Sequence, residues 1–82
     1  MDKTFQVGIY SRDKIIYEGQ AVSLVAPSAS GYLGVLAHHA PLVAKLSAGK
    51  IILRQSAGSV SVIDSSPGGF MQVLQNQVTL LL

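Results

Sequence analysis

The chain has 82 residues, of which 49% are hydrophobic and 12% charged, and its formal net charge is +2. The lysines and arginines are scattered along the sequence, which argues against a nucleic-acid-binding protein. Cysteine is absent, which excludes disulfides and thiolate chemistry, and no apolar run reaches the ~20 residues of a transmembrane helix. Because so small a domain cannot bury this apolar fraction, we expect an exposed apolar interface within a complex.

Alternating apolar residues predict strands in the first third of the chain. Phe5, Val7 and Ile9 occupy every second position, which is the period of a half-buried strand. A returning strand and a second alternating run follow, separated by polar and glycine-containing segments that predict turns. The expected strands are residues 5–10, 14–17 and 21–26, the expected turns are 11–13 and 18–19, and the expected loop is 27–31.

The middle segment, residues 31–46, contains both histidines of the chain. Its best helical candidate, residues 40–45, is short and begins beside Pro41, which favours an extended conformation for the preceding residue. We therefore expect residues 31–46 to form a partly rigid surface segment rather than a helix. Its core anchors are expected to be Leu33, Val35 and Leu36, and its outward polar side chains Tyr32, His38 and His39.

The last third of the chain again predicts strands. In the clean alternation of residues 59–63 we expect the serines to face outward and Val60 and Val62 to face inward. Strand signals recur about every 8–12 residues along the chain, a spacing typical of an all-β sandwich or barrel. We expect one domain over residues 1–82. The expected strands here are residues 50–55, 59–63, 70–74 and 78–82, with turns at 56–58 and 75–77 and a loop at 64–69.

No constellation of residues indicates catalysis, a metal or a cofactor. His38 and His39 are adjacent, so on an extended chain their side chains point to opposite sides and rarely share one ion. A triad of Ser65, His39 and Asp64 lacks the Gly-x-Ser-x-Gly elbow. The two glycines of residues 31–34 do not complete a nucleotide-binding fingerprint.

Residues 31–42 resemble a known family. The pattern Gly31-x-Leu33-Gly34-Val35-Leu36-x-x-His39-Ala40-Pro41-Leu42 resembles the signature of the epsilon subunit of F-type ATP synthases, which is called delta in mitochondria. Further matches follow in the family's order and extend over essentially the whole chain. They are Tyr17-Glu18-Gly19, Val25-x-Pro27, Leu46-x-x-Gly49, Gly69-Phe70 with Val73, and Asn76 with Val78-Thr79-x-Leu81.

The resemblance implies an all-β fold, a flattened ten-stranded β-sandwich, without the helical hairpin that usually follows it in the family. It implies a non-catalytic subunit of the rotating central stalk, which docks the gamma subunit onto the c-ring and couples ion translocation to ATP synthesis. Such a subunit needs no cofactor and no nucleic acid. It associates peripherally with the cytoplasmic face of the bacterial inner membrane, or with the equivalent organelle membrane.

By position in the family, one set of residues is expected to face the c-ring: Ser28, Ser30, Gly31, Tyr32, His38 and His39. Tyr32 stands where the family usually has an acidic residue, and residues 37–38 replace a usual Pro-Gly. A phenol cannot form the ion pair that a carboxylate forms with a basic loop. We therefore expect Tyr32 to make a stacking or hydrogen-bonding contact instead.

A β-sandwich that binds a ligand, such as a carbohydrate, is the alternative function. That class of module needs a groove and a row of exposed aromatic side chains. The five aromatic residues are instead spread along the chain. We therefore favour the stalk subunit over the binding module.

Overall fold

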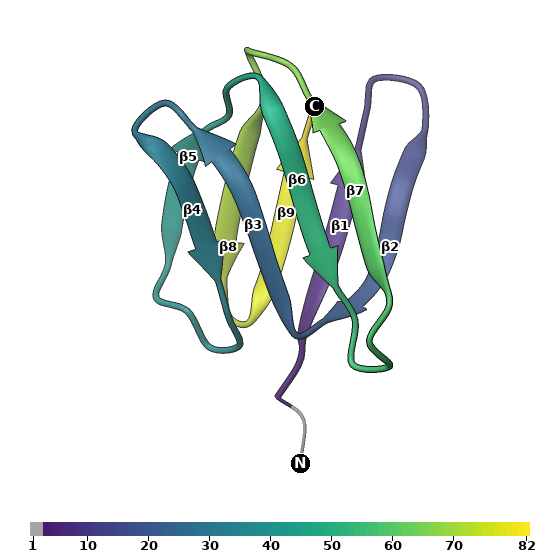
Figure 1. Ribbon diagram of the computed structural model, residues 1–82. Helices are drawn as coiled ribbons and strands as arrows, with labels where there is room; N and C mark the ends of the chain where they lie inside the picture. The colour runs from purple at the N-terminus through teal and green to yellow at the C-terminus, as the bar shows by residue number, and fades with distance from the viewer. Residues whose placement is uncertain (1–2) are drawn as a thin grey trace.

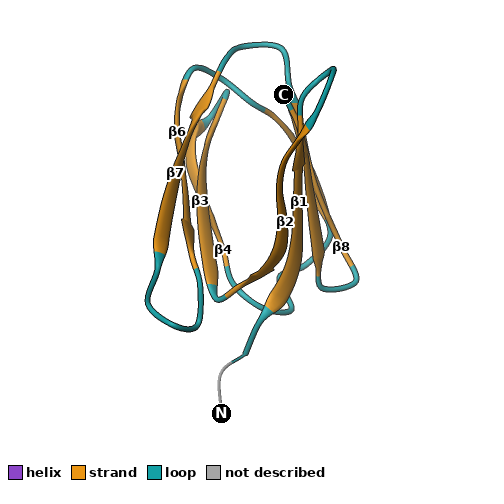
Figure 2. Ribbon diagram, turned by 90° about the vertical axis from the view of Figure 1, so that its right-hand side faces the viewer, coloured by secondary structure: helices purple, strands orange, loops and turns teal. Residues whose placement is uncertain are grey.

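The computed structural model describes residues 3–82, which fold into two facing β-sheets (Figures 1 and 2). One sheet has the strand order β2-β1-β9-β8-β5 and the other β4-β3-β6-β7. The strands are β1 (Phe5–Tyr10), β2 (Ile15–Ala21), β3 (Ser23–Ser28), β4 (Gly31–Val35), β5 (Leu42–Lys45), β6 (Gly49–Arg54), β7 (Val60–Ser65), β8 (Phe70–Leu74) and β9 (Gln77–Leu81). No helix in this range is long and apolar enough to cross a membrane.

The predicted β-sandwich class is confirmed, with a difference in the number of strands. The resemblance implied ten strands, whereas residues 3–82 form nine. Leu46 adds only an isolated bridge to Ser28. A single bridge does not make a strand, but it fixes the end of β5 against the end of β3.

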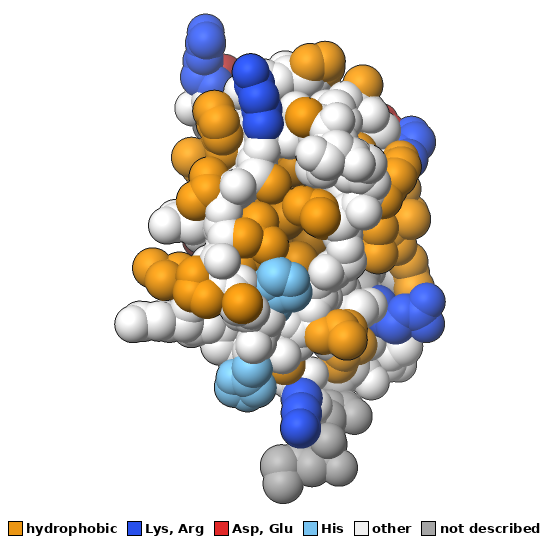
Figure 3. All heavy atoms as spheres, turned by 90° about the vertical axis from the view of Figure 1, so that its left-hand side faces the viewer, with side chains coloured by type: hydrophobic (Ala, Val, Ile, Leu, Met, Phe, Trp, Pro, Cys, Tyr) orange, Lys and Arg blue, Asp and Glu red, His pale blue; other side chains and the backbone are white. Residues whose placement is uncertain are grey.

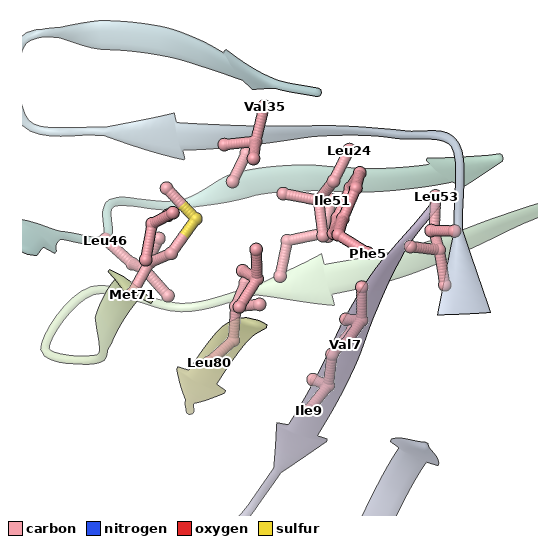
Figure 4. Packing of buried hydrophobic residues seen from close by; sticks show 14 residues of the cluster. Phe5, Val7, Ile9, Leu24, Val35, Leu46, Ile51, Leu53, Met71 and Leu80 are labelled. Atoms are coloured by element: carbon pink, nitrogen blue, oxygen red, sulfur yellow. The ribbon is translucent and has the colours of Figure 1, made fainter. Parts of the chain in front are cut away.

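Alternation along each strand fills the space between the sheets. In β6 the side chains of Ile51 and Leu53 are buried, whereas Lys50, Ile52 and Arg54 face solvent, as the period of two requires. Figure 4 shows side chains from both sheets meeting in this layer. The core residues are Phe5, Val7, Ile9, Ala21, Leu24, Ala26, Val35, Leu46, Ile51, Leu53, Met71, Val73, Val78 and Leu80.

The first and last strands of the chain lie side by side. β1 pairs with β9 in parallel register, with Val7 opposite Val78 and Ile9 opposite Leu80. The other strand pairs are antiparallel. The sheet that contains β1 is therefore completed by residues from both ends of the sequence.

The turn expected at residues 18–19 was wrong, because β2 continues through it to Ala21. Glu18 and Gly19 pair with Gly8 and Val7 of β1. A Cβ atom at position 19 would lie 2.9 Å from the Tyr17 hydroxyl oxygen. Glycine here makes room for the Tyr17 ring and does not turn the chain.

The expected orientation of β7 was also wrong. Val60 is 50% exposed and Val62 59% exposed, so both valines face outward. The register with β6 decides this, because Val62 stands opposite the outward Ile52 while Ser61 stands opposite the buried Leu53. These valines contribute to the exposed apolar surface that the composition predicted.

The prediction for residues 31–46 was correct in part. Val35 is buried and Leu33 packs against the core, but Leu36 is 64% exposed, because it follows the last inward position of β4. The loop expected at residues 27–31 is shorter, since Pro27 and Ser28 belong to β3. Residues 42–45 form β5 rather than a helix.

Candidate partner interface

The turn between β3 and β4, residues 28–32, is built around the buried hydroxyl of Ser28. That hydroxyl donates a hydrogen bond to the carbonyl oxygen of Gly31 and accepts one from the Ser30 amide at 3.2 Å. Gly31 has a φ of 118°, a region that favours glycine because other residues carry a Cβ atom. The Ser28 side chain thus holds an exposed turn in one shape. We call residues 28–32 the 28–32 turn.

Two further serines anchor the 28–32 turn to the rest of the sandwich. The Ser47 hydroxyl donates to the Ser28 carbonyl at 3.1 Å, and the Ser65 hydroxyl donates to the Ser47 carbonyl at 2.9 Å. The Ala29 amide also donates to the Lys45 carbonyl at 3.1 Å. Ser65 therefore has a structural role, and the turn is fixed to both sheets.

Tyr32 lies on the outer face of the sheet β4-β3-β6-β7 and is 60% exposed. Its hydroxyl oxygen is 3.5 Å from the Lys50 amide nitrogen. A Cβ atom at position 49 would lie 2.7 Å from this hydroxyl and 3.0 Å from the Pro27 Cβ. The ring thus lies across Pro27 and Gly49, and it gives the 28–32 turn an uncharged phenol.

A pair of oppositely charged side chains lies near Tyr32. Lys50 Nζ forms a salt bridge with Asp64 Oδ1 across β6 and β7. Both side chains are well exposed, so the pair contributes little to stability. This surface therefore offers hydrogen-bonding groups with locally balanced charge.

The loop between β4 and β5, residues 36–41, carries both histidines, and we call it the histidine loop. His38 is exposed and has a φ of 63°. The Nδ1 atom of the half-buried His39 lies 2.7 Å from the carbonyl oxygen of Ala40. Because a carbonyl only accepts hydrogen bonds, this contact places a proton on Nδ1 and leaves Nε2 free to accept in the neutral ring. Residues 3–82 contain no cluster of three metal-ligand side chains.

The structure divides the expected site residues into two groups at opposite ends of β4 (Figure 1). Ser28, Ser30, Gly31 and Tyr32 lie together at one end, and His38 and His39 lie at the other. With a rise of about 3.3 Å per residue, the four steps from Gly31 to Val35 alone span roughly 13 Å. A small loop of a partner can therefore contact one group but not both.

An apolar groove lies beside the 28–32 turn. It has a volume of about 400 Å³ and opens between the edge strands β4 and β5. Figure 3 shows apolar side chains exposed along this edge of the sandwich, with the two histidines at its margin. The lining residues are Ser28, Ala29, Ser30, Leu33, Leu42, Val43, Ala44 and Lys45.

Comparison with known proteins places the chain in a family. Residues 4–82 match the family model described as ATP synthase, Delta/Epsilon chain, beta-sandwich domain. The chain belongs to this family. The predicted resemblance to the epsilon subunit is thereby confirmed for nearly the whole sequence.

Curated relatives of this delta/epsilon sandwich are ATP synthase epsilon chains. The chain is 41% identical over 81 residues to that of Dichelobacter nodosus, covering 99% of this chain and 56% of the relative. It is 39% identical to the chloroplastic epsilon chain of Chlorella vulgaris, covering 96% of this chain and 58% of the relative. The chain thus spans somewhat more than half the length of these relatives.

Solved structures share the delta/epsilon sandwich fold. One is a chain of the Euglena gracilis mitochondrial ATP synthase, determined as OSCP/F1/c-ring in rotational state 1. It matches with a TM-score of 0.84 at 23% identity, covering 92% of this chain and 48% of that one. A chain of the Tetrahymena thermophila mitochondrial ATP synthase central stalk and c-ring matches with a TM-score of 0.78 at 17% identity, covering 93% and 60%. At these identities the likeness supports the fold.

A tyrosine on the other outer face of this delta/epsilon sandwich has a raised pKa. The Tyr10 hydroxyl donates a 2.8 Å hydrogen bond to Glu18 Oε2. This bond raises the pKa of Tyr10 above its ordinary value of 10.0, and the nearby negative charge of Glu18 adds to the shift. The folded state therefore keeps the Tyr10 proton to higher pH than the unfolded chain does.

We expect the Tyr10–Glu18 pair to stabilise the fold below about pH 10, near the unfolded-state pKa of tyrosine, and to lose that contribution as the pH rises through the raised pKa. In Glu18→Ala, the pKa of Tyr10 should fall back toward its ordinary value, because the acceptor and its charge are gone. Titration of the Tyr10 ring resonances by NMR measures this pKa. An identical midpoint in the parent and in Glu18→Ala would contradict the assignment.

Proposed function

We propose that this chain is the sandwich part of a non-catalytic, epsilon-type subunit in the rotating central stalk of an F-type ATP synthase. In this role it docks the gamma subunit onto the c-ring and helps couple ion translocation to ATP synthesis. One observation carries the proposal: residues 4–82 match the delta/epsilon sandwich family, and the relatives that align over nearly the whole chain are epsilon chains. We propose that residues 1–82 act as one domain in this role.

The structure suggests how two partners share the sandwich. The 28–32 turn is exposed, uncharged and anchored by Ser28 and Ser47, which suits a rigid contact with the c-ring. Tyr32 then supplies a phenol for stacking or hydrogen bonding where the family usually has a carboxylate. His38 and His39, expected from sequence to face the ring as well, lie beyond β4, and we assign them to the gamma subunit.

This role implies a place in the cell. As part of the stalk, the chain associates peripherally with the membrane through the complex. The proposed location is the cytoplasmic face of the bacterial inner membrane, or the equivalent organelle membrane. Ring contact through an uncharged turn is compatible with either proton or sodium coupling.

Mixing the chain with the gamma subunit of the same source tests the proposed function. We expect a one-to-one complex in size-exclusion chromatography with light scattering, because the sandwich exposes large apolar side chains on both sheets, including Val62, Phe70 and Leu81. Separate elution of the two proteins at micromolar concentration contradicts the proposal.

Photo-crosslinking in the assembled complex tests the assignment of the two ends. A photoreactive residue placed at Ser30 is expected to link to subunit c, and one placed at His38 to gamma. Each position serves as the control for the other, since they lie at opposite ends of β4. Links from both positions to the same subunit would overturn the division into two contacts.

A further inference from the structure

The turn between β8 and β9 reaches the histidine loop, although about 38 residues separate them in sequence. Leu74 pairs with Gln77, which leaves Gln75 and Asn76 as a two-residue hairpin turn. Their φ values are 51° and 61°, as the type I′ turn of such a hairpin requires at both positions. Glycine, asparagine and aspartate are common in this conformation, so the turn alone explains only the backbone of Asn76.

The side chain of Asn76 bonds to two other segments and uses both of its polar atoms. Its Oδ1 atom accepts a 2.7 Å hydrogen bond from the His38 amide. Its Nδ2 atom donates a 2.9 Å hydrogen bond to the Thr4 carbonyl. The backbone carbonyl of Asn76 also accepts from the Gln6 amide at 3.1 Å. One residue therefore joins the histidine loop, the start of β1 and the β8–β9 turn.

The hydrogen bond from the His38 amide to Asn76 is made by a residue whose backbone conformation is unfavourable. His38 has a φ of 63°, which residues with a Cβ atom adopt only at a cost in free energy and keep only when their surroundings hold them. The neighbouring amide of His39 bonds within the loop, to the Leu36 carbonyl at 3.2 Å. Asn76 supplies the bond that ties this strained loop to the sheet.

We propose that Asn76 is a positioning residue for the histidine loop: it fixes the His38 backbone and thereby the direction in which His38 and His39 meet their partner. The identity of that partner as gamma rests on the proposed function above. The positioning itself rests only on the contacts of Asn76 with His38 and Thr4. The two parts are therefore tested by separate measurements.

Three variants separate the side chain of Asn76 from its turn. Asn76→Gly keeps a residue that accepts positive φ and removes both side-chain bonds. Asn76→Asp keeps an acceptor for His38 and removes the donor to Thr4. Gln75→Gly changes the same turn at a position for which no side-chain hydrogen bond is found, and it is the matched control.

Hydrogen exchange measured by NMR on the 82-residue chain tests the positioning. We expect the His38 amide to exchange at least about tenfold faster in Asn76→Gly than in the parent, with the buried Ile51 amide unchanged. His38 protection should be retained in Asn76→Asp and in Gln75→Gly. Unchanged His38 exchange in Asn76→Gly overturns the proposal.

Affinity for gamma tests the consequence for binding. Asn76→Gly is expected to bind gamma at least about fivefold more weakly than the parent does. Asn76→Asp and Gln75→Gly are expected to bind gamma with an affinity close to that of the parent. These affinities are compared at equal thermal stability of the proteins. A merely structural role of Asn76 would not produce this rescue by aspartate. If the parent binds and Asn76→Gly binds equally well, the role in binding is overturned. If the parent itself does not bind, the proposed function and this role both fail, while the exchange result still decides the positioning.

Discussion

Ile51→Ala is expected to lower the free energy of unfolding by about 2–5 kcal/mol, the range for truncating a fully buried aliphatic side chain to alanine. Ile51 is 0% exposed and lies between the two sheets with Leu24 and Phe5 (Figure 4). Domains have roughly 0.05–0.15 kcal/mol of stability per residue, so the loss is a large part of the total. Urea denaturation followed by circular dichroism measures it.

The next residue of β6 supplies a matched control. Ile52 carries the same side chain, but it is 39% exposed and stands opposite Val62 on the outer face. Because Ile52→Ala removes an outer-face cross-strand contact and creates no cavity, we expect a loss below about 1 kcal/mol. Equal losses at the two positions would mean that β6 presents both isoleucines to the core, which contradicts its register.

Gly69→Ala is expected to destabilise the sandwich by about 1–3 kcal/mol, the usual cost of inserting a methyl group into a filled space. A Cβ atom at position 69 would clash with the Leu81 carbonyl oxygen and would lie 3.3 Å from the Leu82 Cα. Both obstacles are backbone atoms, so a side-chain rotation cannot relieve the clash. The Gly69 carbonyl also accepts from the Leu46 amide at 2.8 Å, which ties it to the end of β5.

Gly34→Ala is the control for Gly69→Ala. Gly34 is exposed in β4, and a Cβ atom there meets no atom within 4 Å. An alanine restricts the unfolded chain without strain, so the free energy of unfolding should stay unchanged or rise by up to about 1 kcal/mol. Thermal denaturation of both variants tests the contrast. Equal stability of Gly69→Ala and Gly34→Ala would show that the Leu81 carbonyl does not obstruct position 69.

Local alternation predicted seven of the strands, because burial of every second side chain produces an alternation of apolar and polar residues in the sequence. It did not predict β4 and β5, which lie in the segment of residues 31–46 that was not expected to form strands. It did not predict which face of β7 is buried. Val60 and Val62 are more apolar than the neighbouring Ser59 and Ser61, but the register with β6 turns these valines outward. The Glu18-Gly19 pair was similarly ambiguous, since glycine serves either a turn or a close contact with an aromatic ring.

The candidate site was predicted as a list of residues and not as an arrangement. Tyr32, His38 and His39 could be identified from their residue types and from the family pattern. Their separation by β4 could not, because it depends on which residues form that strand. The contact of Asn76 with His38 joins positions 38 residues apart in sequence, and no local pattern indicates such a bond.

The parallel pairing of β1 with β9 has a consequence for synthesis of the protein. Strands β3, β4, β6 and β7 all come from residues 23–65, so their sheet can assemble from one stretch of nascent chain. The opposite sheet needs β9 beside β1, and β9 ends at Leu81. The sheet that contains β1 therefore cannot be completed before β9 has been synthesised, and closure of the sandwich is a late, long-range step.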